Sequence, residues 1–315
     1  MKKDVIKIIF FGDAVGKPGR FAIRDFLTKT QTETSKKYDF VIANIENASH
    51  GFGLTEKNYN DFIEYGVDCM TCGNHIWDKR EIYNYIDSAD KLIRPINYPN
   101  GTKGVGSRIF DMGNFKIGVI NVLGRVFMNL VDSPWEIVAQ EIKQIKEITP
   151  IIVIDFHAEA SAEKICFGKY CSELGVSAFF GTHTHVQTAD ENIENGMAYI
   201  TDAGFCGASD GVIGMDYSTS LSRFLTSIPE RYEVAEGKTT QVNAVEVDID
   251  IISGKALTIK RIFCSSNNIE EEVQSEEENW FTYSHVLLGR GFLAWKNCGY
   301  CNWRWYRSNS DYRSR

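Results

Sequence analysis

Carboxylate, amide and imidazole side chains stand directly after five apolar runs of this chain. These groups form a hard-to-borderline ligand set, which suits manganese, iron or zinc better than a soft thiolate set would. There are more candidate ligands than one metal ion needs. Two ions that share a carboxylate would use all of them, and paired ions of this kind serve phosphoryl transfer. The candidates are Asp13, Glu46, Asn47, Asn74, His75, His157, His183 and His185.

The apolar runs predict how these residues meet. In the first 90 residues they alternate with segments of helical period, which predicts a mostly parallel sheet. The carboxyl ends of the strands in an open α/β sheet form the crevice where ligands bind, so residues far apart in the sequence are expected to converge there. The predicted strands are 6–11, 40–45, 67–71, 151–156 and 178–180, and the predicted helices are 21–28, 55–65, 78–86 and 135–148.

Two antiparallel hairpins complete the predicted fold. Residues 108–112 and 115–122 are short strands joined by Gly113-Asn114, a dipeptide typical of hairpin turns. Residues 242–252 and 256–263 form a second pair around the turn at Ser253-Gly254. The sequence therefore predicts an α/β fold.

Single motifs leave alternatives open. An aspartate after a glycine is most often a turn residue, and Glu46-Asn47 could equally cap a helix. The segment GDAVGKP at 12–18 differs from a P-loop in its spacing, and Pro18 stands where a hydroxyl should bind magnesium. The strongest single motif is Gly181-Thr-His-Thr-His185. The joint pattern favours a metal site, since five of the six histidines lie within these strand-end segments.

Composition excludes several classes of protein. The chain has 315 residues, 43% of them apolar, and a net charge of −8. This length buries a core without disulfides, and the composition excludes global disorder. No apolar run is long enough for a membrane-spanning helix, and the first residues lack the features of a signal peptide, so we expect a cytoplasmic protein. The acidic excess argues against a long nucleic acid bound by charge.

Eight cysteines invite a metal or disulfide interpretation. Cys69 and Cys72 have zinc-knuckle spacing but lie on a predicted buried strand, so we interpret them as small apolar core residues. Cys298 and Cys301 repeat the spacing, which leaves one zinc site with four thiolates as the alternative.

The order of the motifs resembles that of the calcineurin-type dinuclear metallophosphoesterases. Gly-Asp, Glu-Asn, Gly-Asn-His, His and Gly-x-His-x-His follow one another in that order. Longer segments resemble more narrowly the YmdB-like family of bacterial phosphodiesterases, which act on cyclic nucleotides. These segments are GDAVGKPGR at 12–20, IENASHGFGLT at 45–55, GNHIWDKREI at 73–82, RPINYP at 94–99, DFHAEASAEK at 155–164, GTHTHVQTAD at 181–190 and DGVIGMD at 210–216.

The resemblance implies a ligand set for two metal ions. Most of the superfamily has Asp-x-His at the first motif, whereas Val15 stands at the histidine position here, as in the YmdB-like pattern. Asn47 is the implied substitute. The first ion would be held by Asp13, Glu46, Asn47 and His185, and the second by Glu46, Asn74, His157 and His183, with Glu46 bridging.

The resemblance also implies a fold and a mechanism. The fold is a four-layer αββα sandwich, with two divalent ions per subunit, iron or manganese. Two such ions about 3.5–4 Å apart share a hydroxide that attacks the phosphorus of a 2′,3′-cyclic nucleotide in line. His75, near the leaving group, would protonate the departing ribose oxygen. Asp155 and Glu159 flank His157, and either could orient an imidazole, although Glu159 could equally favour a helix N-terminus.

Other functions remain open. A phosphomonoesterase or nucleotidase would use the same site. A regulatory protein would instead act by binding a partner, with structural metal ions. The family's association with RNA turnover makes a nuclease one such partner, and the resemblance also implies a homo-oligomer.

The resemblance ends near residue 268, which predicts a catalytic domain at 1–268. Residues 269–315 differ in composition from the rest of the chain. Six glutamates at 270–278 predict a solvated segment, and four of the six tryptophans follow it. Two alternative explanations fit this composition: an aberrant end of the sequence, or an appended interaction segment.

Overall fold

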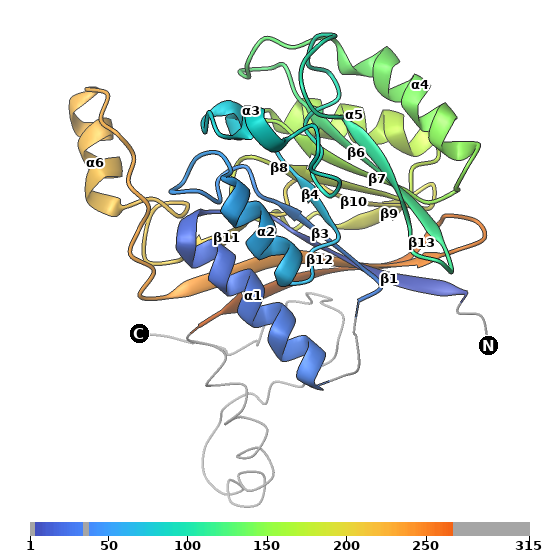
Figure 1. Ribbon diagram of the computed structural model, residues 1–315, viewed down its shortest axis with the longest axis horizontal. Helices are drawn as coiled ribbons and strands as arrows, with labels where there is room; N and C mark the ends of the chain where they lie inside the picture. The colour runs from blue at the N-terminus through green and yellow to red at the C-terminus, as the bar shows by residue number, and fades with distance from the viewer. Residues whose placement is uncertain (1–3, 34–37, 267–315) are drawn as a thin grey trace, which may run out of the picture. The chain divides into compact units, whose positions relative to one another are not determined.

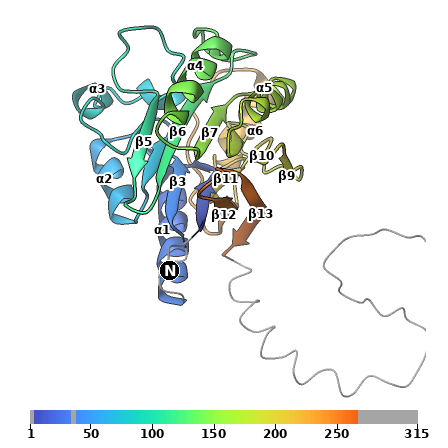
Figure 2. The same ribbon diagram turned by 90° about the vertical axis from the view of Figure 1, so that its right-hand side faces the viewer.

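The computed structural model describes residues 4–33 and 38–266, which form two β-sheets and their flanking helices (Figures 1 and 2). The first sheet contains β1 (Val5–Phe11), β2 (Asp13–Ala14), β3 (Phe40–Asn44), β4 (Cys69–Thr71), β11 (Phe205–Ala208), β12 (Thr240–Asp250) and β13 (Ala256–Ser265). Its order in this part of the chain is β2-β11-β12-β1-β3-β4, with β13 beside β12. The β1, β3 and β4 strands are parallel, as predicted, and the predicted hairpin β12–β13 pairs antiparallel with β1.

The second sheet is built from the middle of the chain. Its strands are β5 (Ser107–Asp111), β6 (Lys116–Leu123), β7 (Ile152–His157), β8 (Ala178–Thr182), β9 (Asn192–Glu194) and β10 (Met197–Ile200), in the order β5-β6-β7-β8-β10-β9. The predicted hairpin β5–β6 is confirmed, and β6, β7, β8 and β10 run parallel.

Helices cover the outer face of each sheet (Figures 1 and 2). The helices α1 (Gly16–Glu33) and α2 (Glu56–Glu64) pack on the first sheet, and α4 (Pro134–Lys146) and α5 (Ser161–Glu173) pack on the second. The short α3 (Ile82–Tyr85) packs with the first group, whereas α6 (Tyr217–Thr226) stands away from both sheets in Figure 1. The expected four-layer αββα sandwich is confirmed.

Strand periodicity explains the layering. On β1, Ile6, Ile8 and Phe10 point into the apolar layer between the two sheets, whereas Ile9 and Phe11 point toward the helices. Successive side chains of a strand alternate between its faces, so a strand that is apolar on both faces must be covered on both. The apolar strands are therefore buried on both faces. Most of the polar residues that follow them are buried as well.

Two predicted helices have different bounds in the structure. α1 begins at Gly16, five positions before the predicted start at Phe21, because Pro18 fits the first turn of a helix, where its missing N–H is not needed. The predicted helix 78–86 is α-helical only at Ile82–Tyr85, and a 3₁₀ helix η1 (Asn74–Trp77) precedes it. The backbone N–H of His75 donates to Glu46 in this segment, which ties the chain to the site described below.

Cys69, in β4, and Cys72, directly after this strand, behave as core residues. Cys69 packs between the sheets, whereas Cys72 packs on the helical side, so the two thiols belong to different apolar layers. Both are fully buried, and burial raises the pKa of each thiol. This agrees with the core interpretation of this pair. Cys298, Cys301 and the predicted segment 269–315 lie outside the described residues. Within the described part of the chain, we find no helix with the length and apolar character needed to cross a membrane.

Candidate metal centre

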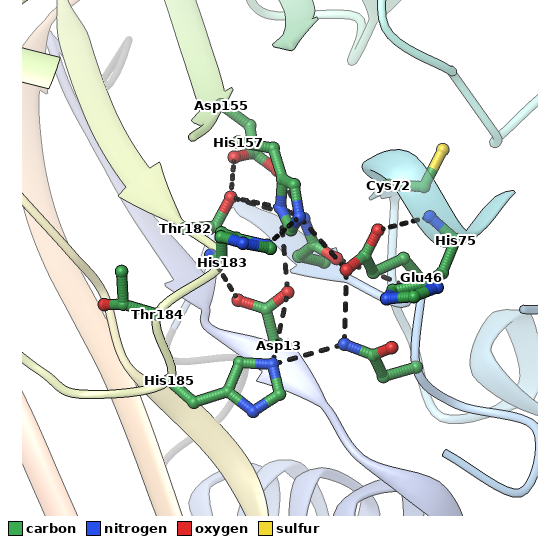
Figure 3. A network of polar contacts seen from close by, with 12 residues as sticks. Asp13, Glu46, Cys72, His75, Asp155, His157, Thr182, His183, Thr184 and His185 are labelled. Atoms are coloured by element: carbon green, nitrogen blue, oxygen red, sulfur yellow. Dashed lines mark hydrogen bonds and ion pairs between the residues drawn. The ribbon is translucent and has the colours of Figure 1, made fainter. Parts of the chain in front are cut away.

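The predicted ligand residues come together where the carboxyl ends of the strands of both sheets meet (Figure 3). Each of these residues lies at the first or last position of a strand or in the segment that follows it. The strands therefore position the ligand residues. The first sheet contributes Asp13, Glu46, Asn47 and Asn74, and the second sheet contributes His157, His183 and His185.

Glu46 is the centre of this cluster. Its Oε1 lies 3.0 Å from Nε2 of His157 and accepts a hydrogen bond from Nδ2 of Asn47 at 3.2 Å. Its Oε2 accepts the backbone N–H of His75 at 3.0 Å. Glu46 is only 1% exposed. One carboxylate therefore contacts groups on both sides of the cluster, as a bridging ligand must.

On one side of Glu46, two imidazoles face each other. Nδ1 of His183 lies 3.0 Å from Nε2 of His157. Glu46, His157 and His183 each offer one ligand atom, and these atoms all lie within 4.8 Å of one another. Asn74 belongs to the same region, since it lies between His75 and Gly73, where an added Cβ would contact both His157 and Glu46.

On the other side, Asp13 and His185 approach each other. Oδ1 of Asp13 lies 3.9 Å from Nε2 of His185 and 3.8 Å from Nδ1 of His157. Nδ2 of Asn47 lies 3.2 Å from the same His185 nitrogen. Asp13 and Asn47 thus lie near His185, and Asp13 lies equally near His157.

Unsatisfied buried oxygens test whether these residues suit a metal ion. Among the described residues, Oδ1 of Asp13, Asn47 and Asn74 are buried and have no hydrogen-bond partner. Such an atom is costly unless something compensates it, and hard cations take carboxylate and amide oxygens. Three orphaned oxygens within the predicted ligand set therefore fit divalent cations. For Asn47, Nδ2 faces His185, so the amide must turn about its last bond to present the oxygen there.

Polar groups behind the imidazoles set their orientation. Oγ1 of Thr182 lies 2.9 Å from Nδ1 of His157 and donates to Oδ1 of Asp155 at 2.7 Å (Figure 3). Asp155 thus reaches His157 through Thr182 rather than directly. Burial raises the pKa of Asp155 to about 7.

The other two imidazoles are oriented by different partners. Nε2 of His183 lies 3.1 Å from Oε2 of Glu159, which places Glu159 on His183 rather than on His157. Nδ1 of His185 lies 2.9 Å from the carbonyl oxygen of Ile213, so that nitrogen donates. In both rings the opposite nitrogen faces the cluster and is left with its lone pair, as metal ligation requires.

The two facing histidines titrate differently. Burial alone would lower the pKa of His157, but the carboxylates around it, chiefly Glu46, raise it to about 9. Burial, followed by the neighbouring His157 charge, lowers the pKa of His183 to about 3. Burial alone would raise the pKa of Glu46, but His157 lowers it well below the usual range. His183 is therefore a ready neutral ligand, whereas His157 holds a proton that a cation must displace.

His75 lies beside the cluster and contributes differently. Its Nδ1 lies 2.8 Å from Oδ2 of Asp78, and its ring packs edge-on against Phe52 with 4.8 Å between ring centres. The side chain is partly exposed at the wall of a cavity of about 360 Å³. Glu46, Asn47, His183 and His185 line the same cavity. Its apolar wall consists of Phe52, Val212, Ile213, Met215 and Phe224.

Comparison with known proteins places this chain in a family. The profile of the YmdB-like protein family matches residues 9–262. The chain belongs to the YmdB-like family. A relative from Bacillus subtilis (strain 168), named 2′,3′-cyclic-nucleotide 2′-phosphodiesterase, is 45% identical over 265 residues, which are 84% of this chain and 99% of the relative.

Two solved structures share the fold of this YmdB-like chain. A hypothetical protein from Thermus thermophilus is 34% identical, has a TM-score of 0.76, and is matched over 82% of this chain and 99% of its own. A novel phosphatase from Mycoplasma pneumoniae is 32% identical, also has a TM-score of 0.76, and is matched over 86% and 98%. The predicted metallophosphoesterase type of sandwich is confirmed, and the chain is a phosphoesterase.

Among the neighbours of the YmdB-like site that sequence reasoning missed are Thr182, Asp78 and Phe52. Thr182 could have been predicted from the sequence, because it lies between a glycine and a histidine of the strongest motif, just after a predicted strand. Asp78 follows His75 by three positions, which places both on one face of a short helix. Phe52 gave no signal, since its contact with His75 depends on a loop.

Proposed function

We propose that this chain is a dinuclear metal-dependent phosphodiesterase that hydrolyses 2′,3′-cyclic nucleotides. The observation that carries the proposal is the set of orphaned ligand oxygens on both sides of one buried carboxylate, Glu46, at the floor of an open cavity. The activity named for the Bacillus subtilis relative supports the substrate class, and its match covers 99% of that relative.

We assign the ligands as the resemblance to the family implied. Asp13, Asn47 and His185 would hold one ion, Asn74, His157 and His183 the other, and Glu46 both. Iron or manganese suits these carboxylate, amide and imidazole groups. When bound, two divalent ions would activate water at neutral pH and neutralise charge on the phosphate oxygens.

The chain's own residues supply the rest of the chemistry. His75 stands at the cavity wall, where it can give a proton to the departing ribose oxygen. Asp78 lies 2.8 Å from Nδ1 of His75 and holds the ring with its other nitrogen free to face the substrate. No side chain is needed as a covalent nucleophile, because water attacks the phosphorus directly.

The cavity wall suits a nucleoside. Phe52, Met215 and Phe224 line it together with the polar groups of the proposed centre, so the cavity would take both a phosphate and an aromatic base. Its volume of about 360 Å³ lies within the range of small-molecule sites, roughly 300–1,000 Å³. The Phe224 side chain is 79% exposed and has, among the described residues, no aromatic or cationic partner.

A phosphomonoesterase is the second candidate. The Mycoplasma pneumoniae structure is described as that of a phosphatase, and the ligand set by itself suits either reaction. A homo-oligomer and a partner in RNA turnover remain predictions from the resemblance, and a cytoplasmic location remains a prediction from the sequence.

A substrate panel with a ligand variant tests the proposal. Purified chain is loaded with manganese or iron and assayed on 2′,3′-cyclic AMP and on 2′- and 3′-AMP. We expect hydrolysis of the cyclic diester and about two ions per chain. Glu46→Gln should lower turnover by about a hundredfold or more, because even outer partners of a metal ligand cost 10–100-fold. Glu136→Gln, on the exposed surface of α4, should change neither value.

The outcomes separate the candidates. Hydrolysis of the monoesters alone would favour the phosphatase. Unchanged metal content and turnover in Glu46→Gln would contradict the whole assignment.

A further inference from the structure

The segment that carries two of the proposed ligands has an unfavourable backbone. His183 has φ of 100° and His185 has φ of 61°, and both lie directly after β8. Residues other than glycine rarely adopt such positive φ values, which are unfavourable and persist only where the surroundings enforce them. The backbone N–H of His183 donates to Oδ2 of Asp13 at 3.1 Å, and Thr184, between the two histidines, is a second anchor of the segment.

Asp202 holds Thr184 at two points. Oδ2 of Asp202 accepts the backbone N–H of Thr184 at 3.1 Å and its Oγ1–H at 2.7 Å. Oδ1 of Asp202 accepts the backbone N–H of Gly204 at 2.8 Å. Both carboxylate oxygens are thus engaged by the protein, although Asp202 lies in the loop after β10, close to the proposed metal centre.

A buried lysine neutralises this carboxylate. Nζ of Lys164, on α5, lies 2.7 Å from Oδ2 of Asp202, and each side chain is only 1% exposed. The Lys164 stem passes over Gly181, where an added Cβ would come within 3.2 Å of Lys164 Cδ. Removing two charges from water is expensive, and a buried ion pair is weak evidence for a gain in stability. A role in geometry explains its presence better.

We propose that Asp202, neutralised by Lys164, is a positioning residue for the metal centre. It fixes Thr184 and thereby holds the imidazoles of the two neighbouring ligands, His183 and His185, in the metal centre. The inference rests on the proposed metal centre and extends it to residues that touch neither the ions nor the substrate. Its consequence is that metal affinity depends on a buried ion pair behind the ligand loop.

Variants of Thr184 test this without any change of charge. Thr184→Val removes the Oγ1–H donor to Asp202 and leaves the ion pair in place. We expect its affinity for Mn²⁺, measured by calorimetry without substrate, to fall by about tenfold, the lower end of the range for partners behind metal ligands. Thr184→Ser keeps the donor and should bind Mn²⁺ within about twofold of the wild type.

Asp202→Asn tests the second half of the proposal. It removes the negative charge and one of the strong acceptors, and we expect Mn²⁺ affinity to fall about 10–100-fold in folded protein. Lys169→Met removes an exposed ion pair from the same helix, Lys169–Glu194, and should leave Mn²⁺ affinity unchanged. Circular dichroism establishes whether each variant is folded. If Asp202→Asn does not fold, the Thr184 pair decides alone.

Normal Mn²⁺ affinity in Thr184→Val, or equal losses in Thr184→Val and Thr184→Ser, would overturn the proposal. This test measures Mn²⁺ affinity, whereas the test of the proposed function measures hydrolysis. A wild-type chain that binds Mn²⁺ but hydrolyses no cyclic nucleotide contradicts the function and leaves this test intact. A wild-type chain that binds no Mn²⁺ overturns both.

Discussion

Oε1 of Glu46 lies 3.0 Å from Nε2 of His157, and this contact joins the two sheets of the sandwich at their ligand-bearing ends. Glu46 follows β3 of the first sheet, and His157 ends β7 of the second. The two side chains can approach because Gly73, between them, has no Cβ. A Cβ at this position would overlap the His157 ring and the Glu46 carboxylate.

Gly73→Ala should therefore damage the metal centre without a change in ligand identity. A Cβ at this position would overlap Cδ2 of the His157 ring and lie 2.5 Å from Oε2 of Glu46, so there is no space for the alanine methyl group. We expect the bound metal to fall by at least about tenfold and stability to fall by about 1–3 kcal/mol, the usual cost of overpacking. Metal analysis and thermal unfolding measure the two effects.

Gly113→Asn is the matched control for this change. Gly113 lies in the β5–β6 turn, where an added Cβ meets nothing within 4 Å, and asparagine tolerates its φ of 82°. Normal metal content in both variants would show that the ligands are not packed as tightly as the structure indicates.

Metal binding should release protons at neutral pH. The raised pKa of His157, about 9, means that its imidazole is protonated at pH 7 in the metal-free chain. Ligation needs the neutral ring, so affinity for Mn²⁺ should rise with pH, by roughly tenfold per unit below that pKa. His183, whose pKa is lowered to about 3, adds no such dependence.

Calorimetric titrations at pH 7.0 and 8.0, in two buffers with different ionisation enthalpies, measure the released protons directly. We expect about one proton per chain from His157. An affinity that is independent of pH over this range would exclude a protonated His157 in the metal-free state.

His75→Ala should separate chemistry from metal binding. General acid catalysis contributes about 10²–10⁴-fold, so kcat on 2′,3′-cyclic AMP should fall by that factor while metal content stays at the wild-type value. Asp78→Asn, which weakens the partner of Nδ1, should give a smaller loss of kcat. Loss of metal from His75→Ala would instead make His75 a ligand.

Phe224→Ala should reduce recognition of the nucleoside. Stacking of a base on an aromatic side chain is worth about 1–3 kcal/mol, so KM for 2′,3′-cyclic AMP should rise by roughly fivefold or more. KM for a small phosphodiester that lacks a base should not change. Leu225→Ala is the control, because Leu225 is 76% exposed on the same helix but does not line the cavity.

Equal effects of Phe224→Ala and Leu225→Ala on the nucleotide would contradict this contact. A change in sedimentation coefficient in both variants would identify the exposed face of α6 as a contact with another protein chain rather than with substrate.

Much of the architecture follows from the sequence alone. Apolar runs that alternate with amphipathic segments determined the parallel strands, since both faces of such strands must be buried. Thr55 predicted the start of α2, and the structure shows its side chain accepting the backbone N–H of Asn58. The candidate ligands could be named because metal ligation restricts the residue types and because strand ends meet at one edge of a sheet.

Tertiary structure decided which groups serve each ligand. The direct partners of the imidazoles come from other elements: Thr182 for His157, Glu159 for His183, and the carbonyl oxygen of Ile213 for His185. No local pattern encodes such pairs, because they depend on the distance and angle between elements that pack only in the folded chain. The pKa difference between His157 and His183 has the same origin, since burial and neighbouring charges, not sequence spacing, determine it.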